Sequence, residues 1–218
     1  MPVDGGSERR VSRILDTESL SSRARYDLLT SLVVPRPIGW ISTASAARVP
    51  NLAPYSFFAA LSASPMLVGI AIGARRGGAL KDSLSNLRAR PWFCVNVVTV
   101  DQLERMNRTA ADLPPETSEF DFGGSALSWP TDVEAPFVAD CPAVLVCRLE
   151  REIGLEPSTS TLVIGRVTEV RLDPDLELEP DSYRVSPRAL PVVGRLGGNA
   201  YVLPGPIQEL ARPDGRGG

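Results

Sequence analysis

Pro35-Arg36-Pro37-Ile38-Gly39-Trp40-Ile41-Ser42-Thr43 is the most informative segment of this chain, and Asn51-Leu52-Ala53-Pro54-Tyr55-Ser56-Phe57-Phe58 follows it after a short turn. Both segments are rich in apolar and aromatic residues and are flanked by turn residues, which is typical of β-strands. Strands are predicted at 36–44, 51–58, 66–73, 92–98, 142–152 and 161–172, the last with an irregularity at Gly165. The chain is therefore predicted to be mainly β, closed into an antiparallel barrel that leaves no unpaired edge.

Three segments have helical character. Apolar residues at four-residue spacing predict an amphipathic helix within 16–32 that packs on the barrel. A second helix is predicted at 79–89, and a third begins at Asp101, which forms a capping-box pattern with Glu104. Residues 111–136 show little periodicity and are predicted to be a long loop, a kind of segment that is often functional.

One domain accounts for most of the chain. The 218 residues can bury a substantial core, and we expect a disordered tail at 1–15, a single domain at 16–205 and a second tail at 206–218. The net charge of −3 argues against nucleic-acid binding, and no apolar run reaches the ~18 residues of a membrane span. We therefore expect no nucleic-acid partner, no membrane and a cytoplasmic location.

The sequence contains no histidine, which excludes catalytic mechanisms and metal sites that depend on imidazole. Catalysis would have to come from carboxylates, hydroxyls, a lysine or a bound cofactor, and a cofactor is the simplest source. The cysteines are odd in number, lie in apolar strand-like segments and are predicted to be core residues of a protein in a reducing compartment: Cys94, Cys141 and Cys147. No metal site is expected.

Lys81 is the only lysine among 23 basic residues. A glycine pair at 77–78 precedes it and an apolar-periodic segment follows, so it lies at a predicted helix start, where an anion can bind. A compact ammonium on a flexible stem differs from the planar guanidinium of arginine, which favours a functional reason for this lysine. Chance, under a sequence bias toward arginine, is the alternative.

The two strand segments and Lys81-Asp82-Ser83 resemble, in their residues and in their order, motifs of the flavin reductase-like family of FMN-binding split barrels. The resemblance extends over 30–203 and includes Cys141-Pro142, Gly165-Arg166-Val167 and Arg195-Leu196-Gly197-Gly198-Asn199-Ala200-Tyr201. It implies a Greek-key split β-barrel with a few peripheral helices. The turn at 44–50 lacks the glycine that is usual in the family, which leaves the geometry of this hairpin open.

FMN requires a site for a dianionic phosphate and flat apolar walls for its ring. Lys81, Ser83 and the free amides of the helix start suit the phosphate, and the arginine pair 75–76 either joins them or lies in a solvated turn. Asp82 can equally be a helix N-terminal charge, and Phe57 and Phe58 are expected in the core. The resemblance implies ten cofactor-binding residues: Thr43, Asn51, Ala53, Pro54, Tyr55, Ser56, Lys81, Asp82, Ser83 and Arg195.

The resemblance further implies a homodimeric oxidoreductase in which NAD(P)H reduces FMN, so that the flavin rather than a side chain carries the chemistry. The preferred interpretation is an NAD(P)H:flavin oxidoreductase, with a second substrate or a partner monooxygenase as acceptor. Segment 194–198 lacks the glycine spacing of a dinucleotide fold, so a nicotinamide would bind in an open groove. Three roles are open for Arg195: a contact with this nicotinamide, a contact with the neighbouring subunit, or a turn residue.

Two alternatives stay open. An FMN-dependent enzyme of specialised metabolism would act on a dedicated organic substrate, and the loop at 111–136 would then be a lid that shapes its pocket. A nonenzymatic flavin-binding electron carrier would bind FMN without turnover of any donor.

Overall fold

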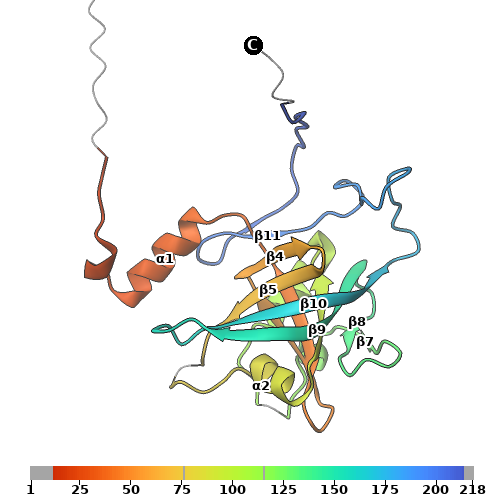
Figure 1. Ribbon diagram of the computed structural model, residues 1–218, viewed down its shortest axis with the longest axis horizontal. Coiled ribbons are helices and arrows are strands. Elements are labelled where there is room, and N and C mark those ends of the chain that lie inside the picture. The colour runs from red at the N-terminus through yellow and green to blue at the C-terminus, as the bar shows by residue number, and fades with distance from the viewer. Residues whose placement is uncertain (1–11, 76, 115, 214–218) are drawn as a thin grey trace, which may run out of the picture.

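Antiparallel strands form most of the computed structural model, which describes residues 12–75, 77–114 and 116–213. Seven strands make one sheet in the order β3-β2-β6-β9-β10-β5-β4 (Figure 1). Their bounds are β2 Gly39–Ala44, β3 Pro50–Tyr55, β4 Phe58–Ala63, β5 Met66–Ile72, β6 Trp92–Val97, β9 Ala143–Gly154 and β10 Thr161–Leu172. All neighbouring strands in this sheet are antiparallel, and the mainly β fold is confirmed.

Short elements complete the fold. A three-stranded sheet contains β1 Arg36–Pro37, β11 Gly194–Arg195 and β12 Tyr201–Val202. A two-stranded hairpin contains β7 Leu127–Ser128 and β8 Phe137–Val138. The helical segments are η1 Thr17–Ser19, α1 Ser22–Leu32, α2 Asp82–Ala89, η2 Val100–Gln102, α3 Leu103–Arg108 and α4 Glu119–Gly123. In the described ranges, no helix has the length and apolarity needed to cross a bilayer.

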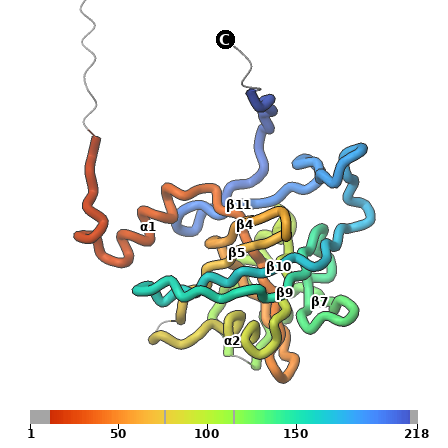
Figure 2. Tube along the Cα trace, in the orientation of Figure 1, coloured from red at the N-terminus to blue at the C-terminus, as the bar shows by residue number. Residues whose placement is uncertain are grey.

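The predicted tails are only partly described. Residues 12–15 and 206–213 are exposed and have no regular structure, and the C-terminal segment leads away from the strands in Figure 2. Residues 1–11 and 214–218 of the expected tails lie outside the described residues.

The edge strands of the large sheet, β3 and β4, are consecutive in the chain and are separated only by Ser56 and Phe57. The Phe57 carbonyl accepts a 2.9 Å hydrogen bond from the amide of Ala71, so the chain turns from one edge of the sheet toward the other at this point. Phe58 packs directly over Gly39, where an added Cβ would come within 2.9 Å of the ring. One strand was predicted over 51–58, and the structure divides it into β3 and β4 because this turn curves the sheet.

Strand β2, which lies next to the edge strand β3, is buried on both faces. Trp40 and Ile41 are fully buried and alternate between two separate apolar clusters, as side chains of a strand must. One cluster is completed by Phe120 and Phe137, and the other contains Phe93. Burial on both faces explains why the segment reads as an almost continuous apolar run.

The predicted loop at 111–136 is wrong in one respect, because much of it is ordered against the core. It contains α4 and part of the β7–β8 hairpin, and Phe120 and Ala135 are fully buried. Trp40 and Leu52 need an apolar cover on this side of the sheet, and Phe120 provides part of it. Apolar packing therefore organises this segment without a periodic sequence signal.

The helix predicted within 16–32 is shorter than expected and is not packed on the barrel along its length. Thr30 is the only buried residue of α1, and the helix extends sideways from the strands in Figure 1. Leu32, expected on the buried face, is 70% exposed, and Leu29 is 50% exposed. The apolar periodicity is correct, but within residues 12–75, 77–114 and 116–213 no element buries this face.

Three local predictions have clear outcomes. The capping box lies at Thr99 and Gln102, not at Asp101 and Glu104, because the helical segment begins with the 3-10 turn η2. The irregularity at Gly165 is confirmed as a shift in the β9–β10 register. All three cysteines are buried and unpaired, which confirms their prediction as core residues.

The hairpin between β2 and β3 closes without a glycine. Ala44 faces Pro50 in register, and the amide of Ser45 donates a 3.0 Å hydrogen bond to the carbonyl of Val49. Arg48 takes the left-handed conformation, with φ of 65°, which glycine would adopt more easily. Its guanidinium lies 4.6 Å from the centroid of the Trp129 ring.

Candidate functional site

The start of α2 carries the only lysine of the chain. Lys81 is the N-cap residue and has an extended backbone, with φ of −73° and ψ of 148°, and its side chain makes no capping hydrogen bond. The first amides of a helix have no acceptor within the helix and point outward, where they attract an anion. Lys81 and these amides therefore face the same space.

Ser83, in the first turn of α2, connects the helix to β3. Its Oγ accepts hydrogen bonds from Asn51 Nδ2 at 3.1 Å and from the Tyr55 hydroxyl at 3.0 Å. Because two donors occupy the lone pairs of this buried oxygen, the Ser83 hydroxyl hydrogen is left to donate to a third group. Burial raises the pKa of Tyr55 to about 12, so that Tyr55 remains a donor at neutral pH.

The charges around Ser83 are only partly balanced. Arg75 forms an ion pair with Asp82, which occupies both of these side chains. Among the described residues, no carboxylate lies within ion-pair distance of Lys81. A lysine ammonium, a serine hydroxyl and helix amides are the donors that a phosphate group requires.

These groups line one cavity of about 100 Å³, which we call the Lys81 cavity. Seven of the ten residues predicted from the sequence line it: Asn51, Ala53, Pro54, Tyr55, Lys81, Asp82 and Ser83. Arg75 lines it too, whereas Arg76 lies outside the described residues. Thr43 does not; it is fully buried, and its hydroxyl accepts a 3.1 Å hydrogen bond from Asn86.

Sequence reasoning missed the acidic wall of the Lys81 cavity. Glu119, at the start of α4, is buried and accepts a 3.1 Å hydrogen bond from the amide of Leu52. Burial raises the pKa of the Glu119 carboxyl above its ordinary value. Asp112 and the segment 109–111 also line the cavity. The only available signal was an acidic residue at a possible helix start in a segment without periodicity.

Ser56 and Arg195 line a second cavity of about 190 Å³, which we call the Arg195 cavity. Pro54 and Ala110 line both cavities, so the two are adjacent along β3. The remaining lining residues are apolar or aromatic: Tyr26, Ile38, Met106 and Tyr201. The lining contains no acidic residue, in contrast to the Lys81 cavity.

The polar groups of the Arg195 cavity are held in position by the protein. Arg36 Nε donates a 3.3 Å hydrogen bond to Ser56 Oγ, which leaves the Ser56 hydroxyl hydrogen for another acceptor. The Arg195 guanidinium lies 4.5 Å from the centroid of the Tyr201 ring. The Tyr201 hydroxyl donates a 2.9 Å hydrogen bond to Asn107, which fixes this ring.

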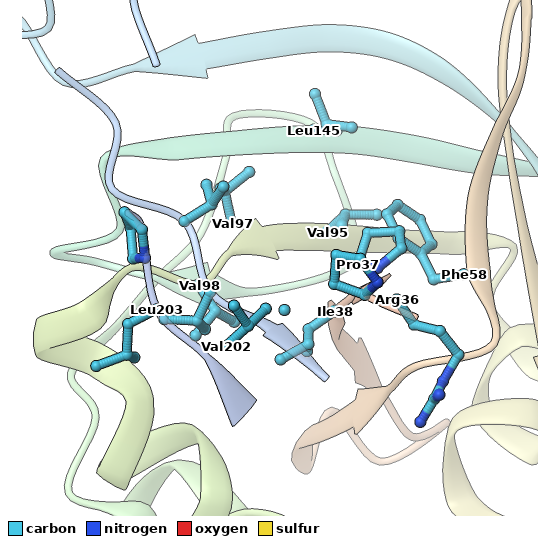
Figure 3. A pocket seen from close by; sticks show the side chains of 15 residues that line it. Arg36, Pro37, Ile38, Phe58, Val95, Val97, Val98, Leu145, Val202 and Leu203 are labelled. Atoms are coloured by element: carbon cyan, nitrogen blue, oxygen red, sulfur yellow. The ribbon is translucent and has the colours of Figure 1, made fainter. Parts of the chain in front are cut away.

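Two larger cavities are almost entirely apolar. One, of about 390 Å³, lies in front of β6, and Figure 3 shows Arg36 at its rim with the guanidinium pointing away from Val97 and Leu145. The other, of about 520 Å³, lies between α1 and β4. Arg36 is the only charged residue in either lining, and its side chain is occupied by protein acceptors. Within the described ranges, no group of histidine, cysteine or acidic residues could hold a metal ion.

Comparison with known proteins identifies the fold and the family. A family model for the flavin reductase-like domain matches residues 31–186. The structure is similar to nitrilotriacetate monooxygenase component B from Bacillus cereus, with a TM-score of 0.86 and 28% identity over 92% of this chain and 99% of that one. It is similar to 2-nitrobenzoate 2-nitroreductase from Pseudomonas fluorescens, with a TM-score of 0.83 and 27% identity over 93% and 98% of the two chains.

A third similar structure defines the architecture. A Shewanella frigidimarina protein with a split barrel domain has a TM-score of 0.81 at 22% identity, and the alignment covers 93% of this chain and all of that one. The large antiparallel sheet with few helices is therefore a split barrel. The chain belongs to the flavin reductase-like family, and the resemblance stated from the sequence is confirmed. Its class is that of the flavin-related oxidoreductases.

Proposed function

We propose that this protein binds FMN and acts as an NAD(P)H:flavin oxidoreductase. The phosphate would bind in the Lys81 cavity and the ring would extend along β3 into the Arg195 cavity. The observation that carries the proposal is the hydrogen bonding of Ser83, which accepts from both Asn51 and Tyr55 and so presents its own hydrogen beside Lys81, which has no carboxylate partner among the described residues. Such an arrangement of donors has no acceptor among the described residues.

The chain's own residues would bind, orient and shield the cofactor. When bound, the flavin accepts hydride from NAD(P)H and transfers electrons onward. Pro54, at the boundary of the two cavities, has no amide hydrogen and lies on an edge strand, so it offers a flat apolar surface there. Ser56 offers a hydroxyl donor, because Arg36 already donates to its oxygen.

The acidic wall supports FMN rather than a dinucleotide flavin. One phosphate would be held by Lys81, while a second phosphate nearby would approach Glu119 or Asp112. A phosphate and a carboxylate in the same small cavity repel each other unless a cation neutralises one of them. We therefore expect FAD to bind more weakly than FMN.

A homodimer is part of the proposal, and a second copy of this chain is the expected cover of the apolar surface around α1 and β4. Five of the six residues of β4 are exposed, although most are apolar. Exposed apolar side chains on this surface belong to Leu29, Leu32, Val33, Phe57, Leu61 and Met66. A contiguous patch of this kind is typical of a subunit interface.

The acceptor of the electrons is a further part of the proposal. Similarity to nitrilotriacetate monooxygenase component B supports a partner monooxygenase. The alternative of a dedicated organic substrate is favoured by the Arg195 cavity, which contains a cation and two tyrosines, and by similarity to 2-nitrobenzoate 2-nitroreductase. The free buried cysteines support the proposed cytoplasmic location.

One experiment tests the core of this proposal. FMN, FAD and riboflavin are titrated into wild-type protein and into Lys81→Ala, and oxidation of NADH and NADPH is followed with saturating FMN. We expect FMN to bind best and Lys81→Ala to weaken FMN about 10- to 100-fold, the scale of a charge-assisted hydrogen bond. Riboflavin should lose much less, because it has no phosphate. No flavin binding by the wild type, or equal losses for FMN and riboflavin, would contradict the proposal.

A further inference from the structure

We infer that Arg195, supported by Arg36, stabilises the negative charge of the reduced flavin ring, so that the protein binds reduced FMN more tightly than oxidised FMN. This inference rests on the proposed function and adds to it a role for two residues. Its consequence is that reduced FMN stays bound at concentrations at which oxidised FMN dissociates.

Arg195 is fixed in place but retains unused donors. Its Nη2 group donates to the carbonyl of Gly198, and its guanidinium stacks on the ring of Tyr201, which Asn107 holds in turn. Among the described residues, Nη1 and Nε of Arg195 have no hydrogen-bond acceptor, and no carboxylate is paired with this side chain. The side chain is half-buried and lines the Arg195 cavity, so its remaining donors are available to a ligand there.

Arg36 adds a second positive charge behind the cavity wall. The side chain is 7% exposed and donates to the carbonyls of Thr30, Val33 and Leu196 at 2.6, 3.0 and 3.0 Å. These acceptors are neutral, and the described residues include no carboxylate paired with Arg36. Burial, and repulsion from Arg195, lower the pKa of Arg36.

Arg36 is buried and Arg195 is half-buried, and neither has a counter-charge among the described residues. A buried charge is normally paired, because the protein interior solvates it poorly. Both the lining of the Arg195 cavity and the hydrogen-bond partners of Arg36 lack a carboxylate. The adjacent Lys81 cavity, by contrast, contains Asp82, Asp112 and Glu119. The compensating anion is therefore expected from a ligand at the Arg195 end.

Reduction of the flavin produces such an anion. Hydride transfer brings two electrons and one proton to the neutral ring and converts NAD(P)H to NAD(P)+. The ring then carries one additional negative charge until it binds a second proton. Fixed positive charge beside the ring lowers the free energy of this state but has little effect on the neutral oxidised ring. The difference in affinity for the two states equals the shift in the flavin's reduction potential.

Continuity between the cavities favours the flavin ring over a separate small acid as the occupant. Pro54 and Ala110 form part of both linings, so one ligand with a phosphate at one end and a flat ring at the other can span them. The aromatic side chains at the Arg195 end, Tyr26 and Tyr201, suit a planar ring.

The test measures the reduction potential and the affinities, not activity. Dissociation constants for oxidised and reduced FMN, and the midpoint potential at saturating FMN, are determined anaerobically for wild type, Arg195→Gln and Arg195→Lys. We expect Arg195→Gln to lose about tenfold of the preference for reduced FMN, which corresponds to a potential about 30 mV lower for a two-electron couple. Arg195→Lys should retain most of the preference, because it keeps the charge.

Arg48→Gln is the matched control, since Arg48 also stacks on an aromatic ring, Trp129, but lines neither cavity. It should leave the potential unchanged. An unchanged potential in Arg195→Gln overturns the inference, and so does a loss of the preference for reduced FMN in Arg195→Lys that is as large as in Arg195→Gln. In either case, FMN binding by the wild type leaves the proposed function intact. Benzoate is added as a probe: if Arg195→Gln abolishes benzoate binding and leaves the potential unchanged, the cavity holds a substrate carboxylate instead. Absence of FMN binding by the wild type would refute the proposed function itself.

Discussion

Tyr55 donates a 3.0 Å hydrogen bond to Ser83, which joins the edge strand β3 to the first turn of α2. The two residues lie 28 positions apart, and both belong to segments that the sequence singled out. The bond determines the direction of the Ser83 hydroxyl, because an oxygen that already accepts from Tyr55 and Asn51 has its hydrogen left to donate.

Tyr55→Phe tests this relationship. The change removes one donor to Ser83 and lets its hydroxyl hydrogen rotate away from the Lys81 cavity. We expect FMN to bind about 3- to 15-fold more weakly, the scale of one net hydrogen bond, while riboflavin affinity changes less. Isothermal titration calorimetry with both ligands provides the measurement. An effect of the same size on riboflavin would mean that Tyr55 supports the ring and not the phosphate.

Glu119→Gln should have the opposite effect. The glutamine oxygen can still accept from the amide of Leu52, but the negative charge beside the Lys81 cavity is removed. We expect FMN to bind about two- to fivefold more tightly, because a repulsive charge has been eliminated. Glu119→Ala serves as the comparison, since it also removes the acceptor for Leu52 and should destabilise the fold. Weaker FMN binding in Glu119→Gln would show that the carboxylate assists the ligand.

Sequence motifs of the family, rather than hydrophobic periodicity, predicted most of the candidate site. Asn51, Tyr55, Lys81 and Ser83 lie in two short segments whose residue types suggested the same ligand, and the structure brings these segments together at Ser83. Glu119 could not be predicted in this way. Its carboxylate accepts a hydrogen bond from the amide of Leu52, which is 67 residues away in the sequence. The segment that contains Glu119 is ordered by packing of its apolar residues in the same cluster as Trp40, and no local sequence pattern indicates this.

The sequence also predicted the apolar face of the first helix but not what covers it. Periodicity shows that side chains such as Leu28 and Leu32 share a face, yet it contains no information on whether the cover is the same chain or another. The structure leaves Leu28 partly buried and Leu32 70% exposed. The strand break at Ser56 was missed for a related reason, since it depends on Phe58 packing over Gly39 across the sheet.

Gly165 should not tolerate a side chain. A Cβ at this position would come within 2.2 Å of Phe93 Cζ, and Phe93 is fully buried in the core. We expect Gly165→Ala to lower the free energy of unfolding by about 1–3 kcal/mol or more, as for an overpacked core. Gly154→Ala is the matched control, because nothing lies within 4 Å of its added Cβ. Urea unfolding compares the two; equal stabilities would mean that Phe93 can move aside without cost.

The buried cysteines should make the protein sensitive to alkaline pH. Burial raises the pKa of Cys94 to about 12 and that of Cys141 to about 11, from an ordinary value of 9.0, and it raises the pKa of Cys147 as well. The folded state therefore keeps its thiols protonated at a pH where the unfolded chain releases their protons. Their contribution to stability is complete below pH 9 and declines as the pH rises toward these folded-state values.

We expect each such cysteine to reduce the free energy of unfolding by about 1.4 kcal/mol per pH unit in this range. Urea unfolding between pH 8 and 10.5 measures the slope, and Cys94→Ala should flatten it by about one cysteine's share even though the variant is less stable at every pH. Because the chain has a single lysine, the other side chains that titrate in this range are mainly its four tyrosines, and Tyr55, whose pKa burial raises to about 12, adds its own slope near pH 10. A slope that is unchanged in Cys94→Ala would show that this thiol does not remain protonated in the folded protein.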